Sequence, residues 1–121
     1  MQRKFRLTRS EDFKRVRRSG KSYAHPLVVL IVQTHDQRST KVPHVRIGVA
    51  AGRTVGTAVY RNRAKRLLRE AMRTLIPHIV SGFDLILIAR PALVSATLEQ
   101  TRQALLTLLQ RAQLLIPLNE S

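Results

Sequence analysis

Residues 56–70 of the chain read GTAVYRNRAKRLLRE, a stretch that joins a turn, a helix start and a cluster of positive charge. Gly56 has the backbone freedom that a tight turn or a close backbone approach requires, and Thr57 is a residue type that caps helix N-termini. The spacing of the apolar residues that follow predicts a helix over 58–75. Its inward face consists of Ala64, Leu67, Leu68, Ala71 and Leu75.

The outer surface of this predicted helix carries six cations between positions 61 and 73, with Glu70 as the one acid among them. Like charges one turn apart destabilise an isolated helix. A solvated cationic face is the simplest interpretation of a charge run, but solubility does not require so strong a bias. A phosphate backbone explains it, because each phosphate that a cation neutralises releases condensed counterions. We therefore predict that this helix binds RNA.

The whole chain is strongly basic, with 22 lysines and arginines against seven acids and a net charge of +15. Such a charge favours a nucleic-acid partner. The length of 121 residues fits one domain over 1–121, and 44% apolar residues suffice for a core. The chain has no cysteine and no apolar run long enough to span a bilayer. We expect a cytoplasmic protein without membrane contact, with frayed ends at about 1–6 and 116–121.

The basic residues concentrate in two segments. Nine of the 22 lie in residues 1–21 and seven in residues 53–73. This division predicts two separate RNA contacts rather than one diffuse positive surface. The sequence shows no helix-turn-helix pair that would favour DNA as the partner.

The N-terminal half of the chain predicts one helix and two or three strands, of which two can be placed. The helix covers residues 11–19, with Ser10 as its cap and Gly20 in a left-handed conformation at its end. A continuous apolar run at 27–33 indicates a strand buried on both faces. Alternating apolar residues at 45–51 indicate a half-buried strand.

The C-terminal half predicts a further strand and a further helix. The segment Phe83–Ala89 is a second continuous apolar run and therefore a buried strand. A last helix fits residues 97–113, because its leucines recur at helical spacing. Thr97 and Gln100 have the spacing of a capping box at its start. Together these elements predict one sheet with helices packed on it.

The sequence shows no catalytic constellation of its own. Glu11 and Asp12 are explained as first-turn charges of a helix, and Asp84 begins a strand. The glycines before Arg53 lack the spacing of a phosphate-binding loop. No set of acids has the convergence that a metal-dependent nuclease needs, and we expect no protein metal site. The histidines, which also lack metal-ligand spacing, are His25, His35, His44 and His78.

Four segments, in order, carry a resemblance to a known family. They are RLTRSEDFKRVRRSG at 6–20, VRIGVAAGRTVG at 45–56, GTAVYRNRAKRLLRE at 56–70 and DLILIARP at 84–91. The chain resembles the bacterial ribonuclease P protein subunit, of which the RNR block is a specific motif. The resemblance implies an α+β fold of order α-β-β-β-α-β-α, with one central sheet and a left-handed β-α-β crossover. From pattern alone a right-handed crossover is expected.

The resemblance also implies which residues contact the catalytic RNA of the enzyme. They lie in the turn before the predicted second helix and on that helix. Arg53 stands where the family has two adjacent lysines, so one of two cations is missing at this point. The expected contact residues are Arg53, Gly56, Arg61, Asn62, Arg63, Lys65, Arg66 and Arg69.

A second implied surface is a cleft between the first helix and the sheet, which takes the single-stranded 5′ leader of precursor tRNA. Phe13 has the helical spacing of a core residue relative to Val16, but the resemblance places it in this cleft. The family's other two cleft aromatics correspond to Arg17 and Ile31. His25, where relatives have asparagine, is a candidate polar contact. The cleft is therefore expected to be less aromatic and more cationic than in the family.

The function implied by the resemblance is removal of the 5′ leader from precursor tRNA by ribonuclease P. The catalytic RNA and precursor tRNA are the expected partners. Cleavage is expected at the RNA, with Mg²⁺ held mainly by RNA and no cofactor required by the polypeptide. The alternative is a ribosomal or other structural RNA-binding protein without a catalytic partner, which co-purified RNA would distinguish.

Overall fold

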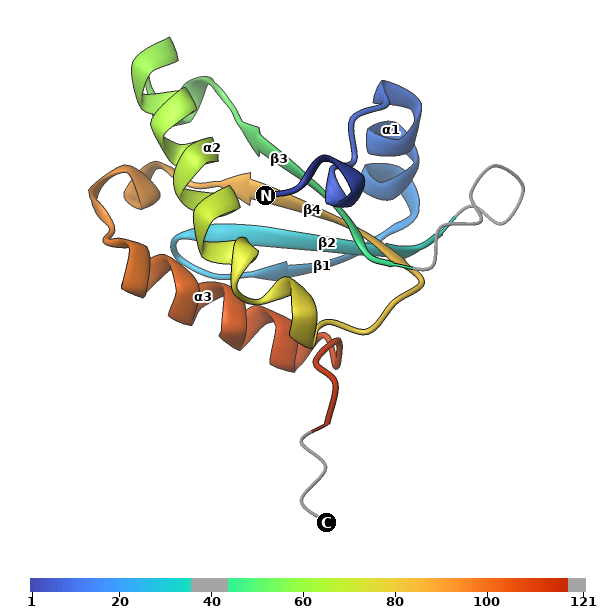
Figure 1. Cartoon of the computed structure of the whole chain (residues 1–121). Coiled ribbons are helices and arrows are strands. Elements are labelled where there is room, and N and C mark those ends of the chain that lie inside the picture. Colours follow the sequence, from blue (N-terminus) through green and yellow to red (C-terminus); the bar gives the residue numbers. More distant parts are fainter. Residues whose placement is uncertain (36–43, 118–121) are drawn as a thin grey trace.

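The computed structural model describes residues 1–35 and 44–117, and shows three α-helices around one sheet (Figure 1). Most of the polar segment between the predicted strands at 27–33 and 45–51 lies outside the described residues, and so do the last four residues of the chain. Short 3₁₀ helices, labelled η, connect several elements. In order, the elements are η1 (Arg3–Phe5), α1 (Ser10–Ser19), β1 (Lys21–Ala24), β2 (Val28–Thr34), β3 (Arg46–Ala51), η2 (Arg53–Val55), α2 (Ala58–Arg73), η3 (Ile76–His78), β4 (Phe83–Ala89), η4 (Pro91–Ser95) and α3 (Leu98–Arg111).

The four strands form one sheet in the order β1-β2-β4-β3. The β1–β2 and β2–β4 pairs are antiparallel, whereas β3 and β4 are parallel. Parallel neighbours need a crossover connection, which α2 provides between β3 and β4. The predicted α+β class and the order α-β-β-β-α-β-α are confirmed.

The two faces of the sheet bury different helices, because side chains alternate along each strand. Leu30 of β2 and Leu85 and Leu87 of β4 join the large core cluster with α2 and α3. The alternate residues Ile31 and Ile86 form a smaller cluster with residues of α1. Accordingly, α2 and α3 lie side by side over one face and α1 lies on the other (Figure 1). The α1 face is the less extensively covered one.

Helix α2 has the inward face that its sequence predicts. Ala64, Leu68 and Ala71 are fully buried, and Leu67 is half-buried. Met72, which the predicted face omits, is also buried. The helix is two residues shorter than predicted, ending at Arg73 instead of 75, since a 3₁₀ turn follows.

The turn before α2 confirms the special role of its glycine. Gly56 has φ of +133°, a conformation that favours glycine. Thr57 occupies the N-cap position as predicted, but its side chain makes no capping hydrogen bond. At α3, by contrast, Thr97 and Gln100 form the full predicted capping box.

The predicted ends of α1 are wrong in two respects. Ser10 is the first helical residue, and the N-cap is Arg9, without a side-chain capping bond. Gly20 has extended dihedrals, φ −79° and ψ 161°, rather than a left-handed conformation. This position requires glycine because there is no room for a side chain. A Cβ there would lie 2.4 Å from the Val16 carbonyl oxygen and 2.7 Å from Ile31 Cγ2. Close packing of α1 on the sheet thus replaces the predicted helix cap.

Two further segments differ from the sequence-based expectation. Strand β1 is absent from the pattern-based prediction, because its four residues, KSYA, are too short and too polar to show a strand period. The N-terminal segment, which we expect to fray, contains η1, and Phe5 packs against the large core cluster. Arg6 forms a β-bridge with Ile47, so the segment follows the β3 edge of the sheet.

Candidate nucleic-acid interface

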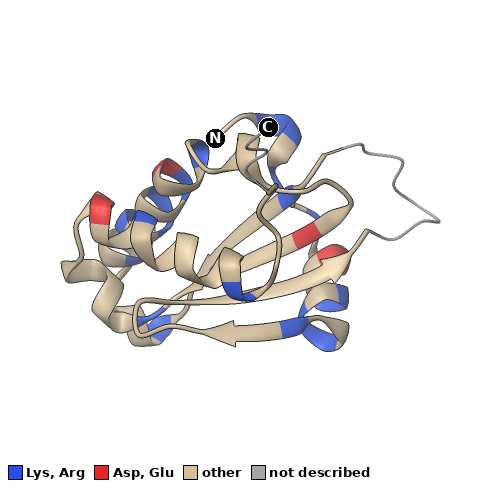
Figure 2. Cartoon of the chain, turned by 90° about the horizontal axis from the view of Figure 1, so that it is seen from below, with Lys and Arg blue, Asp and Glu red and all other residues tan. Residues whose placement is uncertain are grey.

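Helix α2 presents its cations on the surface that the core leaves uncovered. Asn62, Arg63 and Arg66 are exposed, and Lys65 is half-buried. Arg61 donates a hydrogen bond from Nε to the Gly56 carbonyl oxygen at 3.1 Å, which ties its side chain to the turn. Lys and Arg recur along the helices, whereas acids are few (Figure 2).

One acid offsets part of this charge at the end of the helix. Glu70 accepts a hydrogen bond from Arg73 at 2.9 Å. This contact lowers the pKa of the Glu70 carboxyl and raises the pKa of the Arg73 guanidinium. Within residues 1–35 and 44–117, the salt bridges leave the other cations of α2 without an acidic partner. The cations in the N-terminal two-thirds of α2 are therefore the ones whose charge is available to an external anion.

A groove of about 690 Å³ runs along this part of α2. Arg63, Arg66 and Arg69 line it from the helix, and Arg6 lines it from the N-terminal segment. Burial lowers the pKa of the Arg69 guanidinium, and the charge of Arg6 lowers it further. Four guanidinium groups and one carboxylate, that of Glu70, line this groove, and their net positive charge favours a phosphate chain.

A second, smaller groove of about 230 Å³ adjoins it, since Met1, Arg6 and Arg69 line both. Phe13 of α1 and Gly48 of β3 lie in this second groove. The Phe13 ring lies directly over Gly48, where a Cβ would be only 2.3 Å from Phe13 Cζ. Gly48 therefore allows the aromatic ring to rest on the backbone of β3. The side chain of Phe13 is half-buried, so part of the ring stays accessible.

Beside Phe13, the sheet exposes one row of small and aliphatic side chains. The strand register aligns Ala24 with Val29, Val29 with Ile88, and Ile88 with Ala50. Ala24 is exposed and the other three are half-buried. Val29 and Ile88 pack against the same small cluster as Phe13. The row is an apolar floor next to the aromatic ring, and sequence reasoning misses its residues although Val29 lies two positions from Ile31 on the same face.

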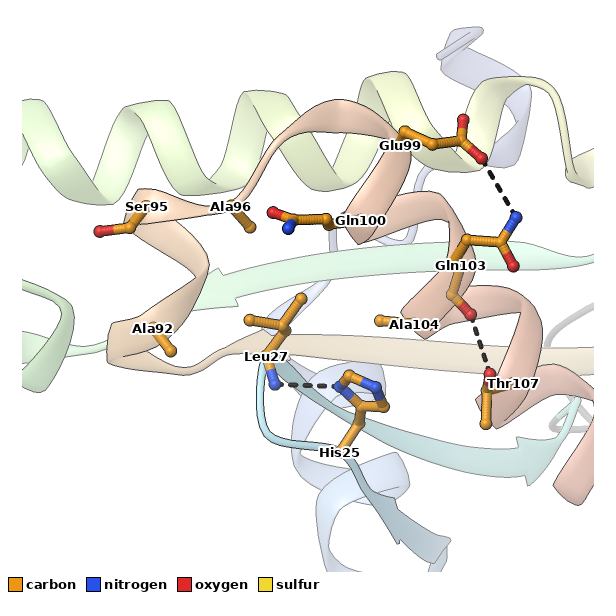
Figure 3. Close-up of a pocket in the computed structure, with 10 residues that line it drawn as sticks. All are labelled: His25, Leu27, Ala92, Ser95, Ala96, Glu99, Gln100, Gln103, Ala104 and Thr107. Atoms are coloured by element: carbon orange, nitrogen blue, oxygen red, sulfur yellow. Dashed lines mark hydrogen bonds between the residues drawn. The ribbon is translucent and has the colours of Figure 1, made fainter.

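Two of the predicted leader-cleft residues are placed differently from Phe13. Ile31 faces α1 but is only 6% exposed, because it packs under α1 with Val16 and Ile86. His25 follows β1 and lines a pocket against α3, on the sheet side opposite to α1 (Figure 3). The structure thus places His25 outside the cleft between α1 and the sheet, and Ile31 beneath α1; their roles as leader contacts stay predictions.

The His25 ring has a structural contact in this position. Its Nδ1 accepts a hydrogen bond from the Leu27 backbone N–H at 3.0 Å (Figure 3). The bond holds the turn between β1 and β2. Arg17, in contrast, is exposed one helical turn after Phe13, where a strand passing over the ring could reach it. Arg53, the remaining predicted contact, is exposed in η2.

A buried ion network fixes α1 on the sheet. Asp84 of β4 is fully buried, and it accepts hydrogen bonds from Arg46 of β3 and from Arg15 of α1. His35 Nε2 lies 3.2 Å from the same carboxylate. Asp12, also buried, lies 3.5 Å from Arg15. The interpretation of the two aspartates as a strand start and a first-turn charge is thus incomplete, because both neutralise arginines inside the fold.

The part of the chain that the structure describes contains no group of three or more His, Cys, Asp or Glu that could hold a metal ion. Its helices include none long and apolar enough to cross a membrane. Fold and site together define a small basic α+β domain with a cationic helix beside an aromatic groove, a class suited to binding RNA.

Comparisons with known proteins identify the family. The ribonuclease P family model matches residues 1–113. The ribonuclease P protein component of Herpetosiphon aurantiacus is 44% identical over 114 residues, covering 94% of this chain and 89% of the relative. The solved structure of the Staphylococcus aureus RNase P protein superposes with a TM-score of 0.79 at 29% identity, covering 92% of this chain and 97% of that one. The solved structure of the Thermotoga maritima RNase P protein superposes with a TM-score of 0.74 at 30% identity, covering 88% of this chain and 96% of that one.

The chain therefore belongs to the ribonuclease P protein family. The prediction made from the RNR segment is confirmed. Family membership assigns the chain to tRNA 5′ processing, and the alternative of a ribosomal or other structural RNA-binding protein is not supported.

Proposed function

We propose that this chain binds two RNAs in a ribonuclease P holoenzyme. The cationic surface of α2 binds the catalytic RNA, and the groove beside Phe13 binds the 5′ leader of precursor tRNA. The observation that carries this proposal is the pair of adjoining grooves, one bordered by four arginines and the other by the Phe13 ring together with Arg6 and Arg69.

The chemistry of each groove fits its proposed ligand. Arginine forks bind phosphate with two parallel hydrogen bonds and suit a folded RNA whose backbone faces outward. An aromatic ring suits a single strand, because an unpaired base of any identity can stack on it. The leader is single-stranded, whereas the catalytic RNA is folded. Arg6 and Arg69, which line both grooves, lower the repulsion between the two RNAs.

The chemical step belongs to the catalytic RNA in this proposal. Asp12 of α1 and Asp84 of β4 are engaged with arginines, which supports a structural role for these two acids rather than a role in metal binding. Mg²⁺ is bound mainly by RNA, and the protein reduces the Mg²⁺ concentration that assembly and substrate binding require. We further propose that this occurs in the cytoplasm.

Reconstitution tests the proposal. The 5′ maturation of one precursor tRNA is measured with the protein alone, with a bacterial ribonuclease P RNA alone at high Mg²⁺, and with both at low Mg²⁺. We expect cleavage in the second and third reactions and none in the first. Cleavage at the correct site by RNase-free protein alone, abolished by replacing a carboxylate, would contradict RNA catalysis. Failure of the protein to lower the Mg²⁺ requirement would contradict its supporting role.

A further inference from the structure

The start of α2 exposes two large apolar side chains among its cations. Val59 is 74% exposed and Tyr60 is 47% exposed. Within the described residues, Ile116 is the one further large hydrophobic residue that is exposed. An aromatic ring left in water on a surface that attracts phosphate suggests a contact with the bases of the bound RNA. The inference therefore rests on the proposed docking of α2 on the catalytic RNA.

The Tyr60 side chain lies close against Gly56 in the turn before α2. Its Cδ2, Cβ and Cγ atoms lie 3.1, 3.3 and 3.5 Å from the position that a Cβ of Gly56 would take. Gly56 therefore has two roles: it adopts a positive φ, and its lack of a side chain lets the Tyr60 ring lie close to the backbone of the turn. A side chain that is already ordered loses little entropy when a ligand stacks on its open part.

Two arginines flank the ring around the helix axis. With about 100° per residue, Arg61 lies about 100° to one side of Tyr60 and Arg63 about 60° to the other. The Arg61 side chain is fixed by its bond to the Gly56 carbonyl oxygen, so it stays beside the ring. Phosphates bound by the two arginines would therefore bracket a nucleotide whose base covers Tyr60.

We propose that Tyr60 stacks on an unpaired base of the catalytic RNA. The docking site of α2 is then a nucleotide outside a helix, flanked by phosphates, and not a continuous duplex. The bases of an A-form duplex stack on each other, so such a duplex offers α2 only its backbone and groove edges. Stacking tolerates any base, so this contact selects RNA shape more than RNA sequence.

The chain has no tryptophan, which makes Tyr60→Trp a single fluorescent reporter at this position. We expect the catalytic RNA to quench its emission, since a stacked base quenches an indole. A duplex RNA of similar length should bind through charge without this quenching. Gln110→Trp, at an exposed position on α3, is the control and should respond to neither RNA. Equal quenching of the Tyr60→Trp reporter by duplex and by catalytic RNA would overturn the proposal.

Affinity for the catalytic RNA provides the second measurement. Tyr60→Ala should weaken binding about tenfold without changing the salt slope, because the arginines still bind the same phosphates. Tyr60→Phe should bind like the unmodified protein, and so should Ile116→Ala, which removes a side chain of similar exposure outside α2. Circular dichroism would check that each variant folds.

The result also separates this inference from the function on which it rests. If Tyr60→Ala binds normally while Arg61→Ala with Arg63→Ala weakens binding, α2 is the docking surface but the stacking contact is refuted. If neither variant affects binding, the docking of α2 itself is refuted.

Discussion

Arg46 donates two hydrogen bonds of 2.9 Å, from Nε and Nη2, to the two carboxylate oxygens of Asp84. The acceptor is fully buried, and Arg15 of α1 reaches the same carboxylate. The Arg46–Asp84 contact joins strands β3 and β4, and the bond from Arg15 joins α1 to this parallel pair of strands. The angle of α1, and with it the position of the Phe13 ring, depends on this buried charge.

Asp84→Asn should therefore destabilise the fold strongly. The substitution keeps the shape of the side chain but leaves two largely buried guanidinium groups without their counter-charge. Removing one partner of a buried ion pair costs about 3–5 kcal/mol. Urea denaturation measures the free energy of unfolding, and Glu70→Gln is the control, since the Glu70–Arg73 pair is exposed and should contribute little to stability. Equal losses for both variants would show that the network does not anchor α1.

Phe13→Ala should weaken the binding of precursor tRNA to the holoenzyme by about 1–3 kcal/mol, the contribution of one stacked base. Mature tRNA has no leader and should bind as before. The measurement compares the dissociation constants of the two tRNAs for each variant. Equal weakening for both tRNAs would refute the leader assignment.

Phe13 also packs on the small core cluster, so a matched control is needed. Val16→Ala removes a fully buried side chain from the same helix, one turn along. It should reduce stability but leave precursor binding unchanged once the variant is folded. The comparison separates loss of stacking from loss of packing.

Arg61→Ala with Arg63→Ala should weaken assembly with the catalytic RNA and reduce its dependence on salt. For each phosphate that the variant no longer neutralises, the slope of log K against log salt concentration should fall by about 0.7–0.9. A salt series of RNA binding measures this slope. An unchanged affinity and slope would exclude α2 as the docking surface.

Leu68→Ala and Arg66→Ala should separate the two sides of α2 by stability. Leu68 is fully buried, so its truncation should cost about 2–5 kcal/mol. Arg66 is exposed, and its truncation should change stability by no more than about 0.5 kcal/mol. Chemical denaturation of both variants checks the assignment, which similar losses would contradict.

The sequence predicts the elements whose pattern is long and periodic. The inward face of α2, the capping box of α3 and the buried strand β4 all agree with the structure, because each depends on local spacing. Strand β1 could not be placed from the pattern, since its four residues are defined by pairing with β2 rather than by their own period. The extended Gly20 likewise reflects how closely α1 approaches the sheet, a tertiary property.

The candidate site is predictable on α2 and only partly predictable near Phe13. Apolar spacing and charge density indicate which face of α2 is exposed and cationic, and this face agrees with the structure without any tertiary information; phosphate binding by it stays a prediction. The cleft depends on which strand residues α1 covers, and the sequence does not contain that information locally. For this reason the sequence names Ile31, which is buried beneath α1, and omits Val29, the more exposed residue on the same face of β2. The arginines paired with Asp84 are indistinguishable from RNA-binding ones in the sequence for the same reason.

Strand β3 passes beneath Phe13 at Gly48 and continues through η2 directly into α2. A rigid stretch of sheet and turn, not a flexible linker, therefore sets the spacing between the two proposed RNA surfaces. In the proposed complex, this fixed spacing would bring Phe13 to the leader nucleotide at a set distance from the cleavage site, whatever base that nucleotide carries. Leaders too short to reach Phe13 should gain nothing from the ring.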